Sequence, residues 1–572
     1  MANLPLRQLG GVGVITDSSP YDLPPNAFSA GNNVIFNEGQ VQRAPVFKPL
    51  FAPLNTVLTW ATDPNTDTYA NDTAVYESAS GGPENTSRFV GTYSDPVAGE
   101  TVFVTDNDGT VRTYPNGSLV FATPTSGTLP TNDSPWSHAQ VAGLSFLARP
   151  GSLPYVRNIA TDAHYSLMGN DWTATDFPNV IRGFLGYCIT LGMNRNGKQL
   201  PTLVKWSNPI QYSSLVSTVA WNPANANYVS GENTIGDMKD PIRDGLALGN
   251  FFLIYSQNEI WMMEPSGDLN VWNWRRIPYE GGVVNVNCVV EVESKHFVFG
   301  DNDIYVHDGF TRQSLAEGRV RRRIFDTLDR SKQTSCFTLH DPVAKLIYFC
   351  YATLQDEANF AGTQFCNQAA VYNYKNDTWS FMDLPNIVGG TEVNSALVSD
   401  FFPTTPSSYA LYNTSYASFS GGGTPRISVM LGIADQAHSL STTYVYAIDL
   451  PTIGLVNLPA APQTLMPAYV ERTGVSLAVQ GLPLRSYKTV QCAIPEASFD
   501  DTGGTFTVQF GSSDLPEATP TYRSTATYNP ATDYKVDMMV SGRYLSYKFS
   551  TSSISNFQIS GMDVEVKSLS RR

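Results

Sequence analysis

The segment Thr101–Ala122 reads TVFVTDNDGTVRTYPNGSLVFA, and in it β-branched or aromatic residues alternate with polar ones. Such alternation over a few residues is typical of a half-buried strand. Asp108-Gly109 and Asn116-Gly117 divide the segment. These dipeptides favour hairpin turns, because the central residues of such turns need a positive φ. The segment therefore predicts three short antiparallel strands joined by tight turns.

Similar hairpin units recur along the chain at fairly regular distances. Their approximate anchors are spaced by 44, 39, 66, 46 and 50 residues: Val102, Phe146, Leu185, Phe251, Phe297 and Ile347. The four-stranded blades of β-propellers repeat every ~40–50 residues, and one insertion near 206–237 accounts for the longest spacing. The sequence therefore predicts an all-β chain with a β-propeller-like body of six to eight blades. A large β-sandwich remains the alternative.

Composition divides the chain into three parts. Residues 1–49 are expected to form an extended N-terminal segment or arm that helps to close the body, and residues 50–463 are expected to be the propeller-like body. Within the body, 407–425 is rich in Ser, Gly and Tyr and is expected to be an exposed loop. From 464–572 the strands lose the blade-like pattern, which predicts a separate antiparallel β-sandwich-like domain.

One amphipathic helix is expected as an insertion in this β-structure. Residues 314–331 read SLAEGRVRRRIFDTLDRS, and Val320, Ile324 and Leu328 lie four positions apart. An apolar residue at every fourth position forms a stripe along one side of a helix. The stretch follows a predicted strand directly, so we expect the helix on the rim of the sheets.

The same stretch carries the strongest basic cluster of the chain: Arg319, Arg321, Arg322 and Arg323. These arginines either contact nucleic acid or an acidic partner, or form a solvated helix face paired with nearby carboxylates. At 3.6 residues per turn, three of them share roughly 100° of arc, while Arg321 points to about the opposite side, among the apolar stripe. A helix wedged between two neighbouring proteins could use both directions. We therefore predict that the four are residues of an interface with a neighbouring protein, with DNA contact secondary.

The composition excludes two classes of protein. The 572 residues include 36 Lys and Arg against 51 Asp and Glu, a formal charge of −15, and only 15% of residues are charged while 12% are aromatic. A disordered tail would need high charge and low hydrophobicity. A protein that wraps nucleic acid would need a basic face. DNA that passes by without being held is not excluded.

The cysteines and the apolar runs indicate the compartment in which the protein is made. The six cysteines lie far apart and form no CxxC pair, which favours ordinary buried thiols made in a reducing cytoplasm; they are Cys188, Cys288, Cys336, Cys350, Cys366 and Cys492. The opening residues lack the apolar region of a secretory signal, and the most apolar runs fall far short of the ~20 residues of a spanning helix. We expect neither a signal nor a membrane span.

No pattern of catalytic or metal-binding residues stands out. None of the six histidines lies in HExxH or at a metal-ligand spacing, and no GxSxG elbow or P-loop is present. His307 and His340 each end a predicted strand before a turn, so a structural role is expected for both. Carboxylates could pair as in a glycosidase, but the sequence selects no pair. We therefore expect no enzymatic activity, no cofactor and no metal.

Several long stretches resemble the tail nozzle proteins of short-tailed bacteriophages, also called tail tubular protein B or stabilisation proteins. The first is residues 4–45, LPLRQLGGVGVITDSSPYDLPPNAFSAGNNVIFNEGQVQRAP. The second is 297–325, FVFGDNDIYVHDGFTRQSLAEGRVRRRIF, and the third joins HDPVAKLIYFCYA at 340–352 with AAVYNYKNDTWSFMDLP at 369–385. The last joins GRYLSYKFS at 542–550 with FQISGMDVEVKSLSRR at 557–572.

This resemblance implies a structural protein of the virion. Proteins of that family have a β-propeller-like body, form a hexameric tube below the portal and adaptor rings, prolong and close the DNA channel, and carry contacts for fibres, a spike or a needle. It implies a virion tail location after synthesis in the host cytoplasm, and no catalytic residues to carry over. Six copies at −15 each would carry −90, which suits a conduit that must not bind passing phosphates.

Two other functions stay open at this stage. Nine tryptophans and the high aromatic content would also suit a carbohydrate-binding or carbohydrate-cleaving β-propeller, such as a tail-associated depolymerase. A capsid decoration protein is the third possibility.

Overall fold

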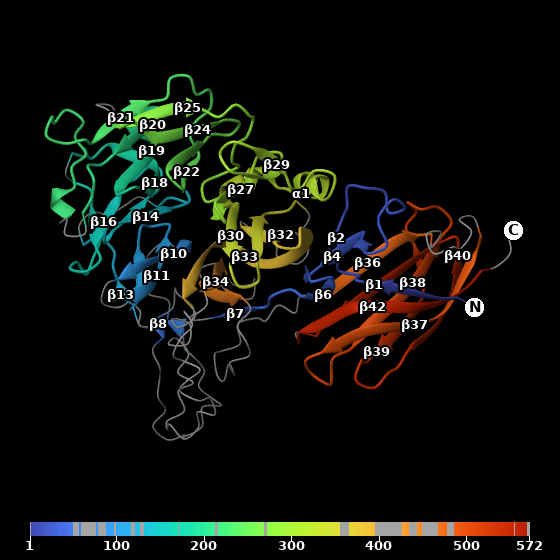
Figure 1. Cartoon of the computed structure of the whole chain (residues 1–572). Helices are drawn as coiled ribbons and strands as arrows, with labels where there is room; N and C mark the ends of the chain where they lie inside the picture. The colour runs from blue at the N-terminus through green and yellow to red at the C-terminus, as the bar shows by residue number, and fades with distance from the viewer. Residues whose placement is uncertain are drawn as a thin grey trace, which may run out of the picture.

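The computed structural model describes most of the chain. The described residues are 2–49, 57–58, 76–77, 87–95, 99–115, 120–125, 131–169, 171–211, 216–267, 271–354, 365–394, 426–433, 443–448, 467–476, 486–553 and 555–568. Figure 1 places a ring of sheets on the left and a pair of facing sheets on the right.

Five four-stranded antiparallel sheets follow one another in chain order and form blades 1 to 5 of a propeller. Blade 1 holds β10 (Ser87–Asp95), β11 (Gly99–Asp106), β12 (Val111–Tyr114) and β13 (Val120–Phe121); blade 2 holds β14 (Ser137–Val141), β15 (Leu144–Ala148), β16 (Tyr155–Asn158) and β17 (Ser166–Leu167); blade 3 holds β18 (Asp176–Phe184), β19 (Tyr187–Arg195), β20 (Lys198–Trp206) and β21 (Gly231–Thr234). Blade 4 holds β22 (Asp244–Leu248), β23 (Phe251–Tyr255), β24 (Ile260–Pro265) and β25 (Trp272–Arg276); blade 5 holds β26 (Val289–Val292), β27 (Lys295–Phe299), β28 (Ile304–His307) and β29 (Arg312–Ser314). The first strand of each blade lies nearest the axis.

A larger sheet supplies the last two blades by bending one long strand. Blade 6 holds β30 (Phe337–Asp341), β31 (Leu346–Tyr351), β32 (Cys366–Asn373) and the first part of β33 (Thr378–Asn394). The second part of β33 pairs with β34 (Arg426–Ile433), β34 with β35 (Thr443–Ile448), and β35 with β7 (Phe47–Pro49), which makes blade 7. Within the described residues the propeller therefore has seven blades, and an N-terminal strand completes the seventh.

The prediction of an all-β, propeller-like body of six to eight blades is confirmed. The turn expected at Asp108-Gly109 joins β11 to β12, and Gly109 has the positive φ, +91°, that favours glycine there. The other expected turn, at Asn116-Gly117, lies outside the described residues. Two further strands, β8 (Val57–Leu58) and β9 (Tyr76–Glu77), pair with each other.

The C-terminal part is an antiparallel β-sandwich, as predicted. One sheet is ordered β40-β37-β42-β6-β5, with β1 on a second stretch of β42; the other is ordered β39-β38-β41-β36-β4. Their bounds are β36 (Ala468–Val475), β37 (Lys488–Phe499), β38 (Phe506–Ser513), β39 (Thr521–Tyr528), β40 (Val536–Gly542), β41 (Tyr544–Thr551) and β42 (Phe557–Ser568). The boundary expected near residue 464 lies outside the described residues.

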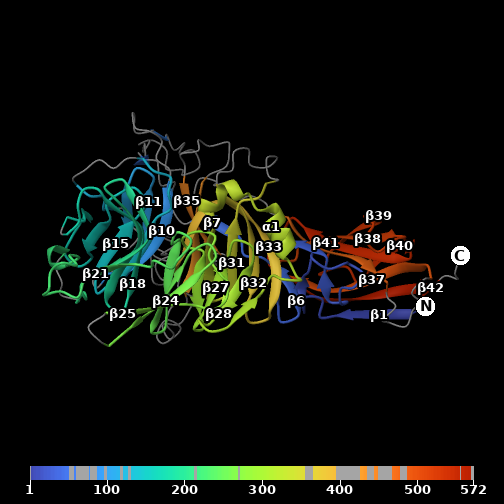
Figure 2. The same cartoon turned by 90° about the horizontal axis from the view of Figure 1, so that it is seen from above.

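The N-terminal 49 residues contribute strands to both halves of the molecule, and we call residues 2–49 the strap. Its strands are β1 (Ala2–Arg7), β2 (Gly13–Val14), β3 (Ala27–Phe28), β4 (Ala30–Asn32), β5 (Val34–Asn37), β6 (Gln40–Arg43) and β7. In the sandwich, β1 and β6 pair with β42 and β4 pairs with β36. In the propeller, β2 pairs with β33 and β7 with β35. The arm expected from the sequence is thus strand-rich and spans the junction (Figure 2).

The expected amphipathic helix is present but shorter than the predicted 314–331. The α-helix α1 covers Arg321–Thr327 and is followed by a 3₁₀ turn, Arg330–Ser335; a second 3₁₀ turn, η2, covers Val216–Thr218 in blade 3. The helix ends because Leu328 is extended, at φ −60° and ψ 123°, and forms a β-bridge with Thr353. The expected exposed loop at 407–425 lies outside the described residues. No helix in the described ranges has the length and apolarity of a membrane span.

The strand that closes blade 7 is anchored by one aromatic side chain. Phe47 is buried, with its ring 5.9 Å from that of Tyr446 on β35, and it packs in the core of blades 6 and 7. Phe121 offers a matched control, because it also lies on an outermost strand, that of blade 1, but is 55% exposed.

We expect Phe47→Ala to lower the free energy of unfolding by about 3–5 kcal/mol, the usual loss for a buried phenylalanine. Phe121→Ala should cost less than about 1 kcal/mol. Urea denaturation followed by tryptophan fluorescence measures both values. Equal losses in the two variants would contradict the role of β7 in closure.

Candidate functional site

The helix α1, which carries three of the four predicted arginines, lies on the side of the propeller that faces the strap (Figures 1 and 2). The local sequence explains why the segment turns there. Gly318 has a φ of +71°, and the Ala316 carbonyl then accepts the amide hydrogens that start the helix. The predicted stripe of Val320, Ile324 and Leu328 is buried, which anchors α1 against the core.

Arg319 is held within its own chain. Its guanidinium donates to both carboxylate oxygens of Asp377, at 2.7 and 3.2 Å, and to the Asp377 carbonyl at 3.0 Å. Asp377 lies in the turn between β32 and β33. The Arg319 carbonyl accepts the amide hydrogens of Thr16 and Asp17, at 2.7 and 3.0 Å. This arginine therefore joins the helical segment to blade 6 and to the strap.

Arg323 is directed toward the sandwich junction. Its guanidinium carbon lies 3.6 Å from the centre of the Phe381 ring on β33, a cation–π contact. Burial raises the pKa of Tyr469 on β36, and the nearby Arg323 charge acts in the opposite direction. Arg323 therefore lies close to residues of both halves of the molecule.

Arg321 and Arg322 are the more exposed pair. The Arg321 side chain donates to the Asn302 carbonyl at 2.7 Å and lies 4.0 Å from Glu317. The prediction that Arg321 lies among the apolar stripe was wrong, because the chain turns at Gly318 and directs Arg321 toward the β27–β28 turn. Arg322 is exposed, and its amide donates to Asp17 at 3.0 Å. The four arginines thus do not share one surface, and their interface role stays a prediction.

The propeller axis is the second candidate site. A cavity of about 330 Å³ lies there, and the first strands of blades 1 to 6 and the second part of β33 all contribute to its lining. Its charged and polar wall includes Arg88, His138, Arg182, Asp244 and Asn287.

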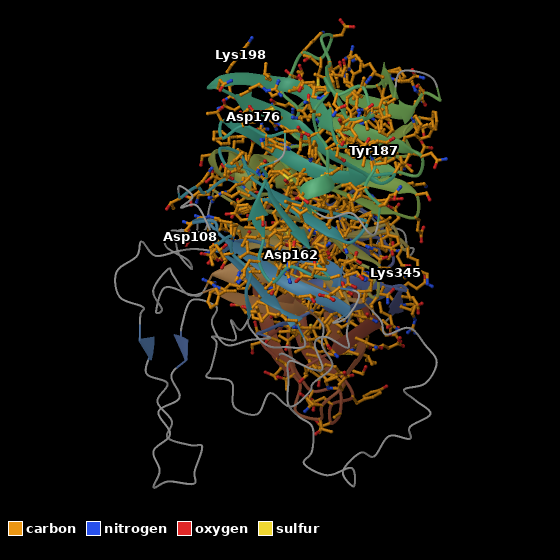
Figure 3. The ribbon with its side chains drawn as sticks, turned by 90° about the vertical axis from the view of Figure 1, so that its left-hand side faces the viewer. Asp108, Asp162, Asp176, Tyr187, Lys198 and Lys345 are labelled. Atoms are coloured by element: carbon orange, nitrogen blue, oxygen red, sulfur yellow. The ribbon has the colours of Figure 1, made fainter. Side chains whose placement is uncertain are left out.

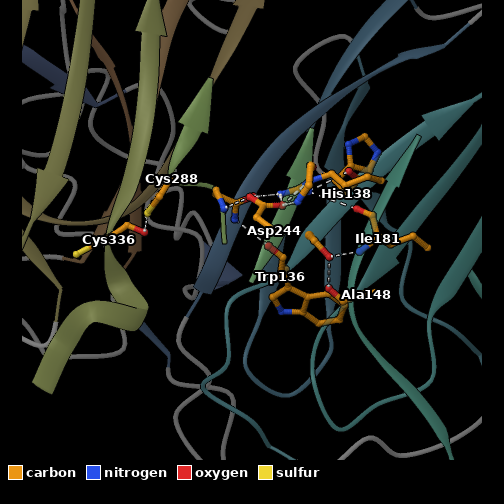
Figure 4. A network of polar contacts seen from close by, with 11 residues as sticks. Trp136, His138, Ala148, Ile181, Asp244, Cys288 and Cys336 are labelled. Atoms are coloured by element: carbon orange, nitrogen blue, oxygen red, sulfur yellow. Dashed lines mark hydrogen bonds and ion pairs between the residues drawn. The ribbon is translucent and has the colours of Figure 1, made fainter. Parts of the chain in front are cut away.

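Three of these residues form a clamp across the axis, which we call the axial clamp: Arg182 on β18, Asp244 on β22 and Asn287 before β26. Arg182 binds both carboxylate oxygens of Asp244, at 3.0 and 3.1 Å, and donates to the Asn287 side-chain oxygen at 2.8 Å. The Asn287 amide donates to Asp244 at 2.8 Å (Figure 4). The clamp thus joins blades 3, 4 and 5.

The clamp continues into blades 2 and 6. Asn287 donates its side-chain amide to the Trp136 carbonyl at 3.0 Å, and its own carbonyl accepts the Thr338 amide at 2.8 Å. The Cys288 thiol donates to the Cys336 carbonyl at 3.0 Å (Figure 4). Inter-blade hydrogen bonds therefore run around most of the ring.

The electrostatics of the clamp indicate a structural role. Burial raises the pKa of Asp244, while the Arg182 charge and the amides of Gly245 and Asn287 act in the opposite direction. With these donors in place, the Asp244 carboxylate is a poor candidate for a general base. Burial, assisted by Arg182, lowers the pKa of the neighbouring His138 to about 3, so this imidazole is neutral at pH 7.

The described residues offer little else for chemistry. No group of three or more His, Cys, Asp or Glu in these ranges could hold a metal ion. All six cysteines are buried free thiols, as predicted. His340 on β30 contacts Glu392 on β33 at 2.9 Å and Tyr374 at 3.3 Å, and His307 is buried in blade 5.

Comparisons with known proteins give a distant structural likeness and no family. No protein-family model and no curated protein matches this chain. Among solved structures, the WD40 β-propeller domain of Doa1 is similar at 12% identity and a TM-score of 0.32, over 54% of this chain and 88% of that one.

We expect Arg182→Met to lower the free energy of unfolding by about 3–5 kcal/mol, because it leaves the buried Asp244 carboxylate without its partner. Lys535→Met removes the exposed ion pair with Asp537, at 2.8 Å, and should leave the free energy of unfolding nearly unchanged, because water screens this pair. Thermal and urea denaturation measure the difference. A loss in Arg182→Met no larger than in Lys535→Met would show that the clamp is dispensable.

Proposed function

We propose that this protein is a structural component of the virion of a short-tailed bacteriophage. Six copies form the tail nozzle below the adaptor ring, extend and gate the DNA ejection channel, and anchor fibres, a spike or a needle. The proposal begins from the resemblance of residues 4–45, 297–325, 340–385 and 542–572 to that family. The observation that carries it is the place of these stretches in the fold.

All four stretches belong to one region of the structure. Residues 4–45 are most of the strap, and 542–572 include β41 and β42, of which β42 pairs with β1 and β6 of the strap. Residues 297–325 lead from β27 through β28 and β29 into α1, and 340–385 include β31 and β32 of blade 6. The stretches that resemble the family therefore lie in elements near the junction of propeller and sandwich. This is expected for a structural protein, which must keep a rigid shape.

The axial cavity supports one route for DNA over another. About 330 Å³ equals the liquid volume of roughly ten water molecules, and side chains of the clamp cross it. A duplex cannot pass along the propeller axis. In a ring of six copies the DNA channel would instead run between the subunits, around the symmetry axis of the ring.

The acidic character of the chain suits such a channel. A wall that carries excess carboxylates does not bind phosphates, so DNA can slide past it. On the side of the propeller away from the sandwich, blades 1, 2 and 3 contribute Asp108, Asp162 and Asp176 (Figure 3). Asp176 is buried beside Arg195, so Asp108 and Asp162 are the accessible carboxylates of the three.

The tryptophans give the carbohydrate alternative less support than their number suggests. Seven of the eight in the described ranges are buried: Trp136, Trp172, Trp206, Trp221, Trp261, Trp272 and Trp379. A side chain that stacks on a sugar must present an open ring face. Trp172 and Trp221 pack instead in one core between blades, and Trp206, Trp261 and Trp272 pack in another.

Electron microscopy of the purified chain mixed with its adaptor ring tests the proposal. We expect six-fold rings continuous with the adaptor, because the family assembles as hexamers. The chain alone should stay monomeric, since rings formed away from the head would be unproductive. Particles with three-fold symmetry, or no association with the adaptor, would overturn the nozzle assignment.

The exposed arginines allow a second test of the same proposal. Arg321→Glu with Arg322→Glu reverses two charges at the predicted interface, where guanidinium groups would bind carboxylates of a neighbour or of the adaptor. We expect ring formation to fall at least about tenfold, which corresponds to a loss of 1.4 kcal/mol or more. Arg523→Glu, at an exposed position on β39, is the matched control and should assemble normally.

Particle counts and DNA release are scored separately for these variants. Normal assembly with slow DNA release would move the two arginines from the interface to the channel wall. Normal assembly with normal release would exclude both roles.

A further inference from the structure

A buried chain of hydrogen bonds links blades 4 and 5 away from the axial clamp. It runs from Tyr279 to His307, then to Tyr255, then to His296, and ends on the Ala247 carbonyl; the successive distances are 3.0, 2.7, 2.6 and 2.8 Å. We call these four side chains the His–Tyr chain. Tyr255 and Ala247 belong to blade 4, whereas the two histidines are cross-strand partners in blade 5.

The hydrogen-bond partners fix the proton positions along the chain. The Ala247 carbonyl can only accept, so His296 carries its proton on Nε2 and accepts the Tyr255 hydroxyl hydrogen on Nδ1. Tyr255 must then accept from His307 Nε2. His307 Nδ1 is left to accept from the Tyr279 hydroxyl and from the Gly309 amide, which lies at 3.2 Å. Every donor has an acceptor only when both imidazoles are neutral.

A proton added to either histidine breaks this order. On His296, a proton on Nδ1 would leave the Tyr255 hydroxyl hydrogen without an acceptor. On His307, a proton on Nδ1 would face the Gly309 amide hydrogen. The His–Tyr chain lies in the core, where water cannot replace the lost hydrogen bonds, because Tyr255, His296 and His307 are at most 2% exposed.

The same strand carries the axial clamp and the end of the His–Tyr chain. In β22, Asp244 accepts the Asn287 amide, and Ala247, three residues further, accepts from His296. Blade 4 is therefore held to blade 5 by polar contacts near both ends of its innermost strand. Loss of the His–Tyr chain leaves one of these two attachments.

We propose that the seam between blades 4 and 5 is an acid-sensitive joint, held closed by the His–Tyr chain only while its two histidines are neutral. Acid protonates the imidazoles once the seam opens and so stabilises the open form. The inference stands apart from the nozzle assignment, since it concerns the propeller of a single chain.

The charged and polar groups around the His–Tyr chain agree with a seam that opens in acid. Burial lowers the pKa of His296 to about 4, against an ordinary 6.5, and burial together with His296 and Arg312 lowers the pKa of His307 to about 3. Asp308, on the turn after β28, acts in the opposite direction on His307. Tyr305 stands 5.8 Å from the His307 ring and is neutral, since burial raises the pKa of its hydroxyl. Because the closed-state values are lowered, the stabilisation is complete above pH 6.5 and falls as the pH drops toward 4.

Hydrogen–deuterium exchange of the full chain at pH 7 and pH 5 tests the proposal, after correction for intrinsic exchange rates. If opening returns the pKa of His296 from about 4 to 6.5, this histidine alone raises the opening equilibrium roughly twentyfold between these two pH values, and His307 adds to the rise. Peptides of β22, β23, β27 and β28 should show this increase. Peptides of the sandwich, whose residues 467–568 contain no histidine, are the internal reference and should not change.

Two variants separate the His–Tyr chain from other effects of acid. In His296→Gln with His307→Gln the acid-induced increase should vanish in the seam peptides. His164→Gln changes an exposed histidine of blade 2 and should keep the increase. If the double variant fails to fold, the native chain alone still decides, because the peptides of β22, β23, β27 and β28 hold no histidine other than His296 and His307.

Two results would overturn the proposal. One is equal exchange of the seam peptides at both pH values in the native chain. The other is an acid-induced increase of the same size in the double variant.

Discussion

The pairing of the strap with strands of the last third of the chain is the constraint on which the rest of the structure depends. β1 and β6 add to β42, β4 adds to β36, β2 lies beside β33, and β7 closes blade 7. Asn33 illustrates the coupling: its amide donates to Phe381 of the propeller, and its side chain donates to the Pro467 carbonyl next to the sandwich. Neither half has all its strands until the N-terminus has been joined to residues more than 300 positions away.

The axial clamp complements the strap inside the ring. In a propeller with an open axis the blades could slide past one another. Buried ion pairs and hydrogen bonds fix the relative positions of the blades that share them. Arg182, Asp244 and Asn287 do this for three blades, and Arg426 of blade 7 bridges to Glu100 of blade 1 at 2.9 Å across the closing seam. Such a subunit suits a static wall better than a binding pocket, in keeping with the nozzle proposal.

The sequence predicted those features that depend on local patterns. The alternation of apolar and polar residues predicted the strands, and the Asp-Gly turn predicted a hairpin. The spacing of the hairpin units predicted the blades. The period of Val320, Ile324 and Leu328 located α1, but not its end, because the bridge from Leu328 to Thr353 depends on tertiary contacts. The strap could not be foreseen as strand-rich, since its partners are distant in sequence. The clamp was missed for the same reason: its three residues come from separate blades and share no motif.

The central claim is that the strap makes propeller and sandwich one body, and hydrogen–deuterium exchange of the strap at neutral pH tests it most directly. In the intact chain, peptides covering β3 to β6, residues 27–43, should exchange as slowly as those of β33 and β42, because an amide in a strand exchanges only when its sheet opens. The edge strand β39, with alternate residues exposed, gives the fast reference. Exchange of the strap as fast as that of β39 would contradict the claim and leave propeller and sandwich as separately stable parts.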